Sequence, residues 1–393
     1  MRIIVLGYVV RGPLGGMVWS NLQYLMGLRE LGHDVYFIED SDDYPACYDP
    51  VQDAMVADAT YGMRFADETF RAIGFGERWA YYDAHQGAWR GACGDRALAL
   101  CETADVLLNL CGVNPLRPWF QAIPCKALVD QDPVFTQVRN LTEPGRRDYA
   151  CGHDAWLTFA ENFGHPGCAV PDDGIPWVAT RQPVVLQEIE PSDPKPHGRF
   201  TTVMNWTSYK PARLDGRTYG MKGESFLPFV DVPRRTRERL ELSVGGAGTP
   251  RELLAENGWA LRDPRMPTAS VATYLRYVRE SKAEFGIAKH GYVVGRSGWF
   301  SERSAAYLAT GRPVVVQDTA FTKWLDAGEG VIAFRTRDEA VAAVDDVAAR
   351  YEHHCRRARE IVEAYFDSRR VLTEMLDKIM ARGRTLPRPQ LGL

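Results

Sequence analysis

The chain has 393 residues, a hydrophobic content of 45%, a charged content of 25% and a formal net charge of −4. This length provides for two or three domains, and the charge gives no electrostatic reason to expect nucleic acid or anionic lipid as the main partner. No apolar run approaches the roughly eighteen residues that a membrane-spanning helix needs. We therefore expect a soluble protein with no integral membrane segment and no nucleic acid partner.

The eight cysteines include no C-x-x-C pair, and several stand in apolar segments such as LNLCG. Reduced thiols of a cytoplasmic protein fit this pattern better than disulfides or a zinc site. The first ten residues, MRIIVLGYVV, begin like a signal peptide, but no small-residue cleavage pattern follows them. They are interpreted as a first strand, and a cytoplasmic location is expected.

Short apolar runs alternate with helical patterns through the first half of the chain. RIIVLGYV predicts a strand, residues 16–31 a helix, and DVYFIED a second strand. Further strands are expected within 104–110, 125–132 and 154–162. Continuous apolar strands separated by helices indicate a parallel sheet covered on both faces, with right-handed crossovers.

The proline-rich segment 181–199 predicts a linker, after which the alternation starts again. The strands expected in this half are 200–206, 240–246, WALRD, EFGIAK, PVVVQD and GVIAF. The helices expected are 223–238, 250–257, 268–280 and a series over 337–382 that breaks at Phe366-Asp367-Ser368.

This pattern predicts an α/β protein with two Rossmann-like doubly wound domains that face a cleft, where a ligand binds at the carboxyl ends of strands. Residues 1–185 are assigned to the first domain and 186–365 to the second. Residues 366–393 are assigned to a carboxyl-terminal helix that crosses back to the first domain. Packing of that helix on its own domain is the alternative.

The first strand leads into GYVVRGPLGGMVW, at the place where a dinucleotide fingerprint would stand. The G-x-G-x-x-G spacing is absent, which disfavours a hydride-transfer enzyme. Gly15 and Gly16 still allow a ligand to approach the start of the following helix. A tight turn that serves packing alone is the alternative.

In the second domain, Asn205 and Trp206 end a strand, and Lys222 opens the next helix. A strand-end amide, an ammonium group and helix-start N–H groups together suit an anion such as a diphosphate. The alternative for Lys222 is an ordinary surface lysine.

The segment 297–321, SGWFSERSAAYLATGRPVVVQDTAF, predicts a polar turn, a short helix and a buried strand. Its turn offers Ser297, Gly298 and Ser301 as anion-binding groups. Glu302 is placed to accept hydrogen bonds from ribose hydroxyls. Further candidates for donor contacts are Lys289, Arg296, Arg303 and Thr319. The alternative is that Ser301 caps the helix and Glu302 balances its dipole.

Two candidate catalytic residues lie in the first domain. Asp130 and Asp132 stand at the carboxyl end of a strand, and Asp132 is the candidate general base. The alternative is that Asp132-Pro133 only forms a turn or a helix start. His153 is the second candidate, with a structural histidine as its alternative. The D-x-D spacing also occurs in metal sites, but no further ligands stand nearby in the sequence, and no metal is predicted.

Two similar α/β domains, a glycine pair after the first strand, Lys222-Gly223 before a helix and a late helix ending in G-x-P-V-V-V occur together. This combination resembles the GT-B class of nucleotide-sugar-dependent glycosyltransferases, especially the bacterial group loosely called family 1 or family 4-like. The resemblance implies that the second domain binds a nucleotide diphosphate sugar as co-substrate, the first domain binds the acceptor, and no cofactor is needed. It places Glu302 near the ribose and Lys222 near the diphosphate, faced by Gly15 and Gly16. A homo-oligomer is compatible with it.

Two features depart from these families. The family 4-like pattern has a glutamate five residues before the glycine of G-x-P, where this chain has Ala306, and Glu302 lies one helical turn earlier. The family 1 pattern has a general-base histidine after the first strand, but the first histidine here is His33. The stereochemical outcome stays open, as do two alternatives: a nucleotide-sugar 2-epimerase of the same fold and a non-catalytic nucleotide-sugar-binding partner protein.

Overall fold

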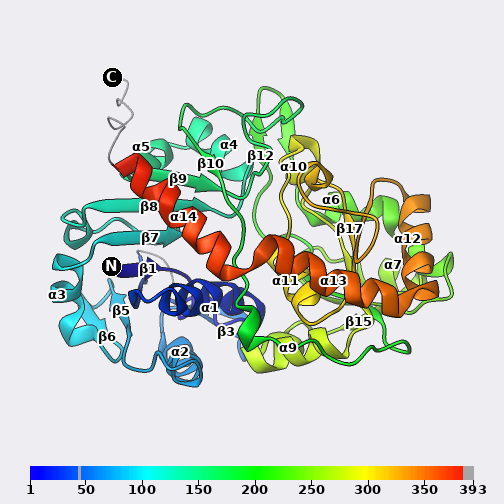
Figure 1. Cartoon of the computed structure of the whole chain (residues 1–393), viewed down its shortest axis with the longest axis horizontal. Coiled ribbons are helices and arrows are strands. Elements are labelled where there is room, and N and C mark those ends of the chain that lie inside the picture. The colour runs from blue at the N-terminus through cyan, green and yellow to red at the C-terminus, as the bar shows by residue number, and fades with distance from the viewer. Residues whose placement is uncertain (43–45, 384–393) are drawn as a thin grey trace.

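The computed structural model describes residues 1–42 and 46–383, and no helix within these ranges is long and apolar enough to cross a membrane. The chain completes one large parallel sheet with its helices before it builds a second one (Figure 1). We call these two parts the first half and the second half.

The first sheet has eight strands in the order β10-β9-β8-β7-β1-β2-β5-β6, and only the pair β5–β6 is antiparallel. Its strands are β1 (Arg2–Leu6), β2 (Asp34–Asp40), β5 (Trp79–Asp83), β6 (Ala88–Arg90), β7 (Val106–Leu110), β8 (Cys125–Asp130), β9 (Ala155–Thr158) and β10 (Val178–Ala179). Its helices are α1 (Gly15–Glu30), α2 (Thr60–Ala72), α3 (Ala97–Glu102), α4 (Phe135–Thr142) and α5 (Arg146–Cys151), and a hairpin pairs β3 (Cys47–Asp49) with β4 (Ala54–Val56).

Alternate residues of β1 enter two different hydrophobic cores, since successive side chains of a strand point to opposite faces. Ile3 and Val5 pack in the core that includes α1, whereas Ile4 and Leu6 pack in the core that includes α3. The first sheet is therefore covered on both faces, which explains why its central strands are largely apolar.

The second sheet is parallel, with the order β15-β14-β11-β16-β17-β18. Its strands are β11 (Phe200–Asn205), β14 (Leu240–Gly245), β15 (Ala260–Arg262), β16 (Ala283–Gly286), β17 (Val314–Gln317) and β18 (Val331–Phe334). Its helices are α6 (Lys222–Phe226), α7 (Arg251–Glu256), α8 (Arg265–Thr268), α9 (Val271–Glu280), α10 (His290–Gly295), α11 (Glu302–Ala309), α12 (Arg337–Ala349) and α13 (Tyr351–Phe366), and a hairpin pairs β12 (Ala212–Leu214) with β13 (Arg217–Tyr219).

The predicted helix 223–238 is shorter than expected. Helix α6 ends at Phe226, and two 3-10 turns follow it, each with a proline among its first two residues, Pro228 and Pro233. Proline lacks the N–H that an α-helix needs, so the prolines end the regular helix.

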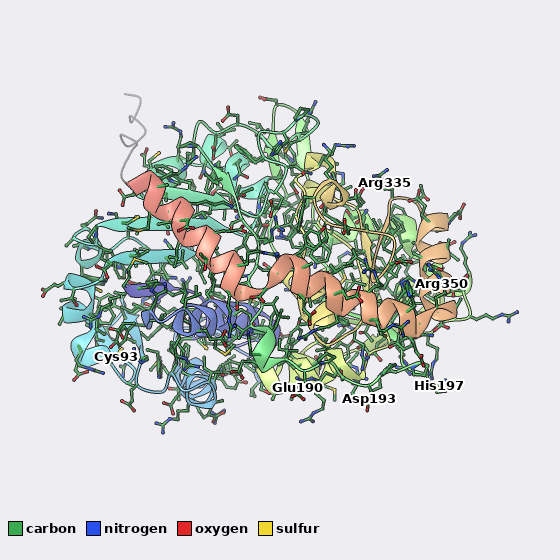
Figure 2. The ribbon with its side chains drawn as sticks, in the orientation of Figure 1. Cys93, Glu190, Asp193, His197, Arg335 and Arg350 are labelled. Atoms are coloured by element: carbon green, nitrogen blue, oxygen red, sulfur yellow. The ribbon has the colours of Figure 1, made fainter. Side chains whose placement is uncertain are left out.

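The linker between the halves is tied down by a buried arginine. The guanidinium of Arg312 donates to the carbonyl oxygens of Ser192, Asp193 and Arg279 at 2.6–3.3 Å. Figure 2 shows Glu190, Asp193 and His197 along the lower edge of the molecule, where this segment runs beside the second half. The arginine of the G-R-P element therefore fixes the linker.

The chain crosses between the halves a second time near Asp367, where α13 ends and α14 (Ser368–Gly383) begins. Val184 of the first crossing exchanges backbone hydrogen bonds with Phe366 and Ser368 of the second at 2.7 and 2.9 Å. Helix α14 then lies along the first half, packed against α1, β8 and β9 (Figure 1). The domain boundaries 1–185, 186–365 and 366–393 stay predictions, and residues 384–393 lie outside the described residues.

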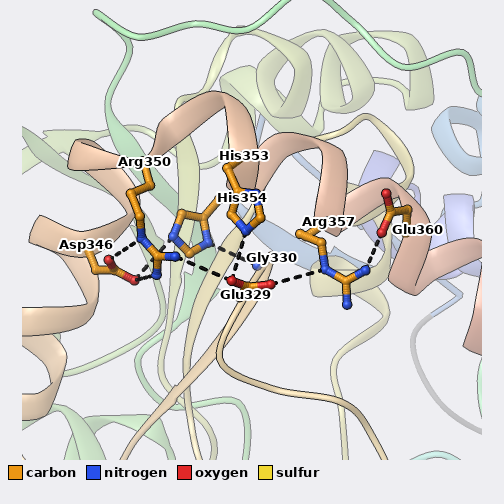
Figure 3. Close-up of polar contacts among 8 residues, drawn as sticks. All are labelled: Glu329, Gly330, Asp346, Arg350, His353, His354, Arg357 and Glu360. Atoms are coloured by element: carbon orange, nitrogen blue, oxygen red, sulfur yellow. Dashed lines mark hydrogen bonds and ion pairs between the residues drawn. The ribbon is translucent and has the colours of Figure 1, made fainter.

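One buried histidine connects α13 to the turn before β18 (Figure 3). The Nδ1 atom of His354 accepts a hydrogen bond from the N–H of Gly330 at 3.1 Å, and its Nε2 atom lies 3.2 Å from Asp346. Burial lowers the pKa of His354 below its usual 6.5, although the Asp346 carboxylate opposes this effect. The other charged groups around it are Glu329, Arg350, His353 and Arg357. A protonated ring has no acceptor for Gly330, so acid removes this link.

We expect the free energy of unfolding to fall as the pH decreases through about 6.5, because the unfolded state then binds protons that folded His354 does not. His153, whose pKa is lowered by burial to about 4, acts in the same direction. Urea unfolding between about pH 7.5 and 5.5 measures the slope. The variant His354→Asn offers an uncharged acceptor to Gly330 and should show a smaller slope, and an unchanged slope would contradict the assignment.

Candidate active site

The carboxyl ends of β8 and β16 bring the predicted base, Asp132, against the second half. Asp132 Oδ1 lies 2.7 Å from Lys289 Nζ, which also contacts the hydroxyl of Tyr209 at 2.6 Å. The hydroxyls of Tyr209 and Tyr292 both donate to the Asp132 carboxylate. Three donors of the second half thus converge on one carboxylate of the first.

A second aspartate fixes this loop from within the first half. Asp130 is buried and accepts hydrogen bonds from Thr136, Gln137 and Thr158 at 2.6–3.0 Å, and from the backbone N–H of Asp132 at 3.0 Å. Burial raises the pKa of Asp130 to about 6. Of the D-x-D pair, Asp130 therefore positions the loop, and Asp132 faces the other half.

The pKa of Asp132 is lowered. Burial alone would raise it, but the charge of Lys289 and the hydrogen bonds from Lys289, Tyr209 and Tyr292 outweigh that effect. A carboxylate held in this way has little tendency to accept a proton. Asp132 needs to leave these donors before it serves as a base.

Glu302 opens α11 and Lys222 opens α6, and both side chains are half-buried. Within residues 1–42 and 46–383, neither side chain has an ion pair at contact distance, and the N–H of Glu302 donates to its own carboxylate. Burial raises the pKa of Glu302 and lowers that of Lys222, and each feels the other's charge. This is a carboxylate and an ammonium group that a ligand is free to bind.

The predicted turn 297–301 uses several of its polar groups within the protein. The N–H of Gly298 donates to the carbonyl oxygen of Thr319 at 2.9 Å, and the N–H of Trp299 donates to Ser297 Oγ at 3.3 Å. Ser301 caps α11 by accepting from the N–H of Arg303 at 3.2 Å. These N–H groups are therefore used within the protein, and a diphosphate at this turn stays a prediction.

This turn also connects the two halves. The carbonyl oxygen of Ser297 accepts from the N–H of Asn162 at 3.0 Å, and Gly298 has a φ of 78°. A Cβ atom at Gly298 would lie 2.8 Å from the Asn162 side chain, so glycine is required by both conformation and space. The hydroxyl of Thr319 donates to the Trp299 carbonyl oxygen at 2.5 Å, which keeps Thr319 within the same contact.

Two arginines predicted near the donor have other partners. Arg303 Nε lies 2.6 Å from the fully buried carboxylate of Glu284, and its NH1 donates to the Val203 carbonyl oxygen at 3.0 Å. Arg296 is exposed, and its Nε donates to the Gly167 carbonyl oxygen at 3.1 Å. The predicted donor contacts of both arginines stay predictions.

The glycine pair after β1 has a steric role. A Cβ atom at Gly15 would lie 2.1 Å from the carbonyl oxygen of Ser270, and one at Gly16 would lie 3.0 Å from the Tyr274 ring. Helix α1 therefore approaches α9 of the second half closely, as the packing alternative requires. A contact of the pair with a donor stays a prediction.

At the end of β11, Trp206 is buried and packs against Phe226, with their ring centroids 5.3 Å apart. A Cβ atom at Gly223 would lie 2.4 Å from Trp206, so the glycine lets α6 begin over the indole ring. Asn205 is exposed at the strand end. Trp206 thus supports the helix start that carries Lys222.

His153 is fully buried away from the Asp132 cluster. Its Nε2 lies 3.0 Å from the Asn109 amide nitrogen and its Nδ1 lies 3.1 Å from the Ala150 carbonyl oxygen. Both ring nitrogens are therefore occupied, and burial lowers its pKa to about 4. The structural alternative describes this histidine better than a catalytic role.

Tyr209 and Tyr292 were missed by the sequence reasoning. Lys289 is the N-cap residue of α10 and Tyr292 lies in its first turn, so a lysine and a tyrosine at a helix start next to a strand end are a usable signal. Tyr209 lies in the connection between β11 and β12 and carries no such signal.

The two facing halves define the GT-B class of glycosyltransferases, and solved structures of this class share the fold. An alpha-glucosyltransferase in complex with UDP-glucose and DNA containing an abasic site matches with a TM-score of 0.60 and 12% identity over 97% of this chain and 99% of that chain. A sucrose-phosphate synthase from Thermosynechococcus elongatus matches with a TM-score of 0.51 and 12% identity over 97% and 100%. The predicted GT-B fold is confirmed.

A family model described as glycosyl transferase-like matches residues 228–377, most of the second half. The predicted class of enzyme, a glycosyltransferase, is confirmed by this match together with the fold. No match was found among curated proteins.

The prediction that excludes nucleic acid as a partner is wrong. Alpha-glucosyltransferase structures with this fold hold DNA together with UDP or UDP-glucose. The net charge of −4 is a sum over the whole chain. It does not describe the local surface that meets an acceptor.

Proposed function

We propose that the protein transfers a sugar from a uridine diphosphate sugar to a hydroxyl group of an acceptor. The observation that carries a nucleoside diphosphate donor is the pair of Glu302 and Lys222, which make no ion pair at contact distance with other described residues and lie within electrostatic range of each other. The choice of uridine follows the structures with this fold that hold UDP or UDP-glucose. A ribose offers hydroxyl donors to a carboxylate, and a diphosphate offers negative charge to an ammonium group.

In this proposal residues 186–365 bind the donor and residues 1–185 bind the acceptor. The bond between the sugar C1 and the diphosphate oxygen breaks, and UDP departs with the electron pair near Lys222. The acceptor oxygen forms the new bond to C1, and its proton passes to a carboxylate, for which Asp132 is the candidate. Lys222 stabilises the charge that develops on the departing diphosphate. Because a lysine fulfils this task, the proposal needs no metal or other cofactor.

We expect Glu302→Gln to weaken UDP binding about 10- to 100-fold, because hydrogen bonds to a charged acceptor become bonds to a neutral one. Isothermal titration measures the dissociation constant, and urea unfolding checks the fold. The matched control is Glu252→Gln, which changes an exposed glutamate in the first turn of α7. Wild-type affinity in a folded Glu302→Gln variant would contradict the ribose assignment.

A panel of UDP, GDP, dTDP and ADP with their common sugars, together with NAD(P), tests the donor by thermal shift. Stabilisation by UDP compounds supports the proposal, and stabilisation only by NAD(P) would overturn it. The acceptor screen includes small molecules, lipids, glycans and DNA. Transfer to an acceptor separates this function from a 2-epimerase and from a non-catalytic binding protein.

A cytoplasmic location in a bacterial cell is part of the proposal. All eight cysteines are free thiols in the structure, which suits a reducing compartment. The bacterial origin rests on the resemblance of the motifs alone.

A further inference from the structure

The ammonium group of Lys289 is enclosed by four side chains. Besides its contacts with Asp132 and Tyr209, it lies over three aromatic rings, 4.4 Å from the centroid of Tyr209, 5.1 Å from that of Phe135 and 5.3 Å from that of Tyr292. Only 14% of the Lys289 side chain and 28% of the Asp132 side chain are exposed. Aromatic faces and a carboxylate together form a site that favours a positive charge.

Lys289 belongs to a group of three cations at the ends of β11 and β16. The charges of Arg303 and Lys289 both lower the pKa of Lys222, so the three groups lie within electrostatic range of one another. Arg303 is balanced by Glu284, and Lys289 is balanced by Asp132. The carboxylate of Asp132, which belongs to the first half, therefore lies beside a group of cations in the second half.

The segment after Asp132 packs directly on the helix that carries Lys289 and Tyr292. A Cβ atom at Gly295 would lie 2.6 Å from Val134, and one at Gly291 would lie 2.6 Å from Phe135, so both glycines of α10 permit the contact. Val134 has a φ of 73°, a conformation that a β-branched residue adopts only when its surroundings impose it. Removing Asp132 from Lys289 therefore disturbs a strained contact between the two halves.

We propose that Lys289, Tyr209 and Tyr292 form an anion-binding subsite. Without a ligand the Asp132 carboxylate occupies this subsite, and a bound phosphate group displaces it. The ligand class is a phosphate or diphosphate, recognised by one ammonium group and two hydroxyl donors. The identity of that ligand as the donor's diphosphate rests on the proposed function, whereas the subsite itself rests on the contacts around Lys289.

One consequence concerns the order of events. While Asp132 forms its ion pair with Lys289, the carboxylate is a poor proton acceptor and the ammonium group is not available to a ligand. Binding of a diphosphate beside Lys222 breaks the ion pair between Asp132 and Lys289. The ammonium group then contacts the diphosphate, and the Asp132 carboxylate becomes free to face the acceptor. The donor therefore binds before the base becomes available, and Asp132 acts as a built-in competitor of the donor.

Titration calorimetry with inorganic pyrophosphate tests the subsite without any sugar. We expect Asp132→Asn to bind pyrophosphate about tenfold more tightly than the wild type, because the competing carboxylate is gone. Lys289→Met should bind it more weakly, and adding Asp132→Asn to Lys289→Met should then change nothing. The matched control is Asp215→Asn, at an exposed aspartate in the β12–β13 turn, with wild-type affinity expected. Unchanged or weaker binding by folded Asp132→Asn would overturn the proposal, as would wild-type affinity in Lys289→Met.

If Asp132→Asn does not fold, a crystal structure of the wild-type protein with pyrophosphate tests the subsite. The expected result is a phosphate oxygen at Lys289 Nζ and an Asp132 carboxylate that has left it. Pyrophosphate bound at Lys222 with the Asp132–Lys289 pair intact would overturn the subsite.

These outcomes are separate from those of the proposed function. Sugar transfer by a protein whose Asp132–Lys289 pair stays intact with bound donor would refute the subsite alone. Displacement of Asp132 by pyrophosphate, with no binding of any nucleotide sugar, would refute the proposed function alone.

Discussion

Replacing Lys222 with methionine is expected to slow sugar transfer about 100- to 1,000-fold, the usual cost of losing one group that stabilises transition-state charge. Lys222 is the ammonium group near Glu302 that no carboxylate of the described chain neutralises at contact distance. It is therefore free to pair with the departing diphosphate, whose negative charge favours the ammonium form. The rate of UDP release at saturating donor and acceptor measures the effect.

The same replacement should leave the free energy of unfolding within about 1 kcal/mol of the wild type. Burial lowers the pKa of Lys222, so the folded protein gains nothing by holding this ammonium group there without a ligand. Lys210→Met, at an exposed lysine of the preceding loop, is the control and should keep the wild-type rate. A wild-type rate in Lys222→Met would remove the lysine from the proposed chemistry.

The parallel strands were predictable because their pattern is local. A strand buried on both faces is a continuous apolar run, and the run DVYFIED has the same bounds as β2, Asp34–Asp40. The hairpin β12–β13 was missed because its strands have three residues each and are partly exposed. No apolar run marks such strands, and only their pairing defines them.

A candidate site residue could be predicted from the sequence only where it is a charged residue at the end of a strand or the start of a helix. Glu302, Lys222 and Asp132 all stand at such positions. The partners of Asp132 are 77 residues away at Tyr209 and 160 residues away at Tyr292, a separation that only tertiary packing spans. The partners of the polar turn 297–301 could not be predicted for a related reason, since Thr319 and Asn162 come from other loops.

The effect of replacing Arg303 on the free energy of unfolding distinguishes a structural arginine from one that binds the donor. We expect Arg303→Met to lower the free energy of unfolding by about 3–5 kcal/mol, because it leaves the carboxylate of Glu284 buried without its cation. Glu284 is fully buried, and its Oε2 atom has no hydrogen-bond partner. The Oε1 contact with Arg303 at 2.6 Å is thus the main compensation for that burial. Urea unfolding at neutral pH measures the loss.

A second replacement tests the cause. Glu284→Gln in the Arg303→Met background removes the unpaired charge, and we expect it to restore a large part of the lost stability. The double variant should also bind UDP with nearly wild-type affinity, because Arg303 directs its guanidinium to Glu284 and the Val203 carbonyl oxygen. An Arg303→Met variant that is as stable as the wild type but binds UDP poorly would place this arginine at the donor. The buried pair would then be a consequence of the empty site, in the same way that Asp132 occupies Lys289.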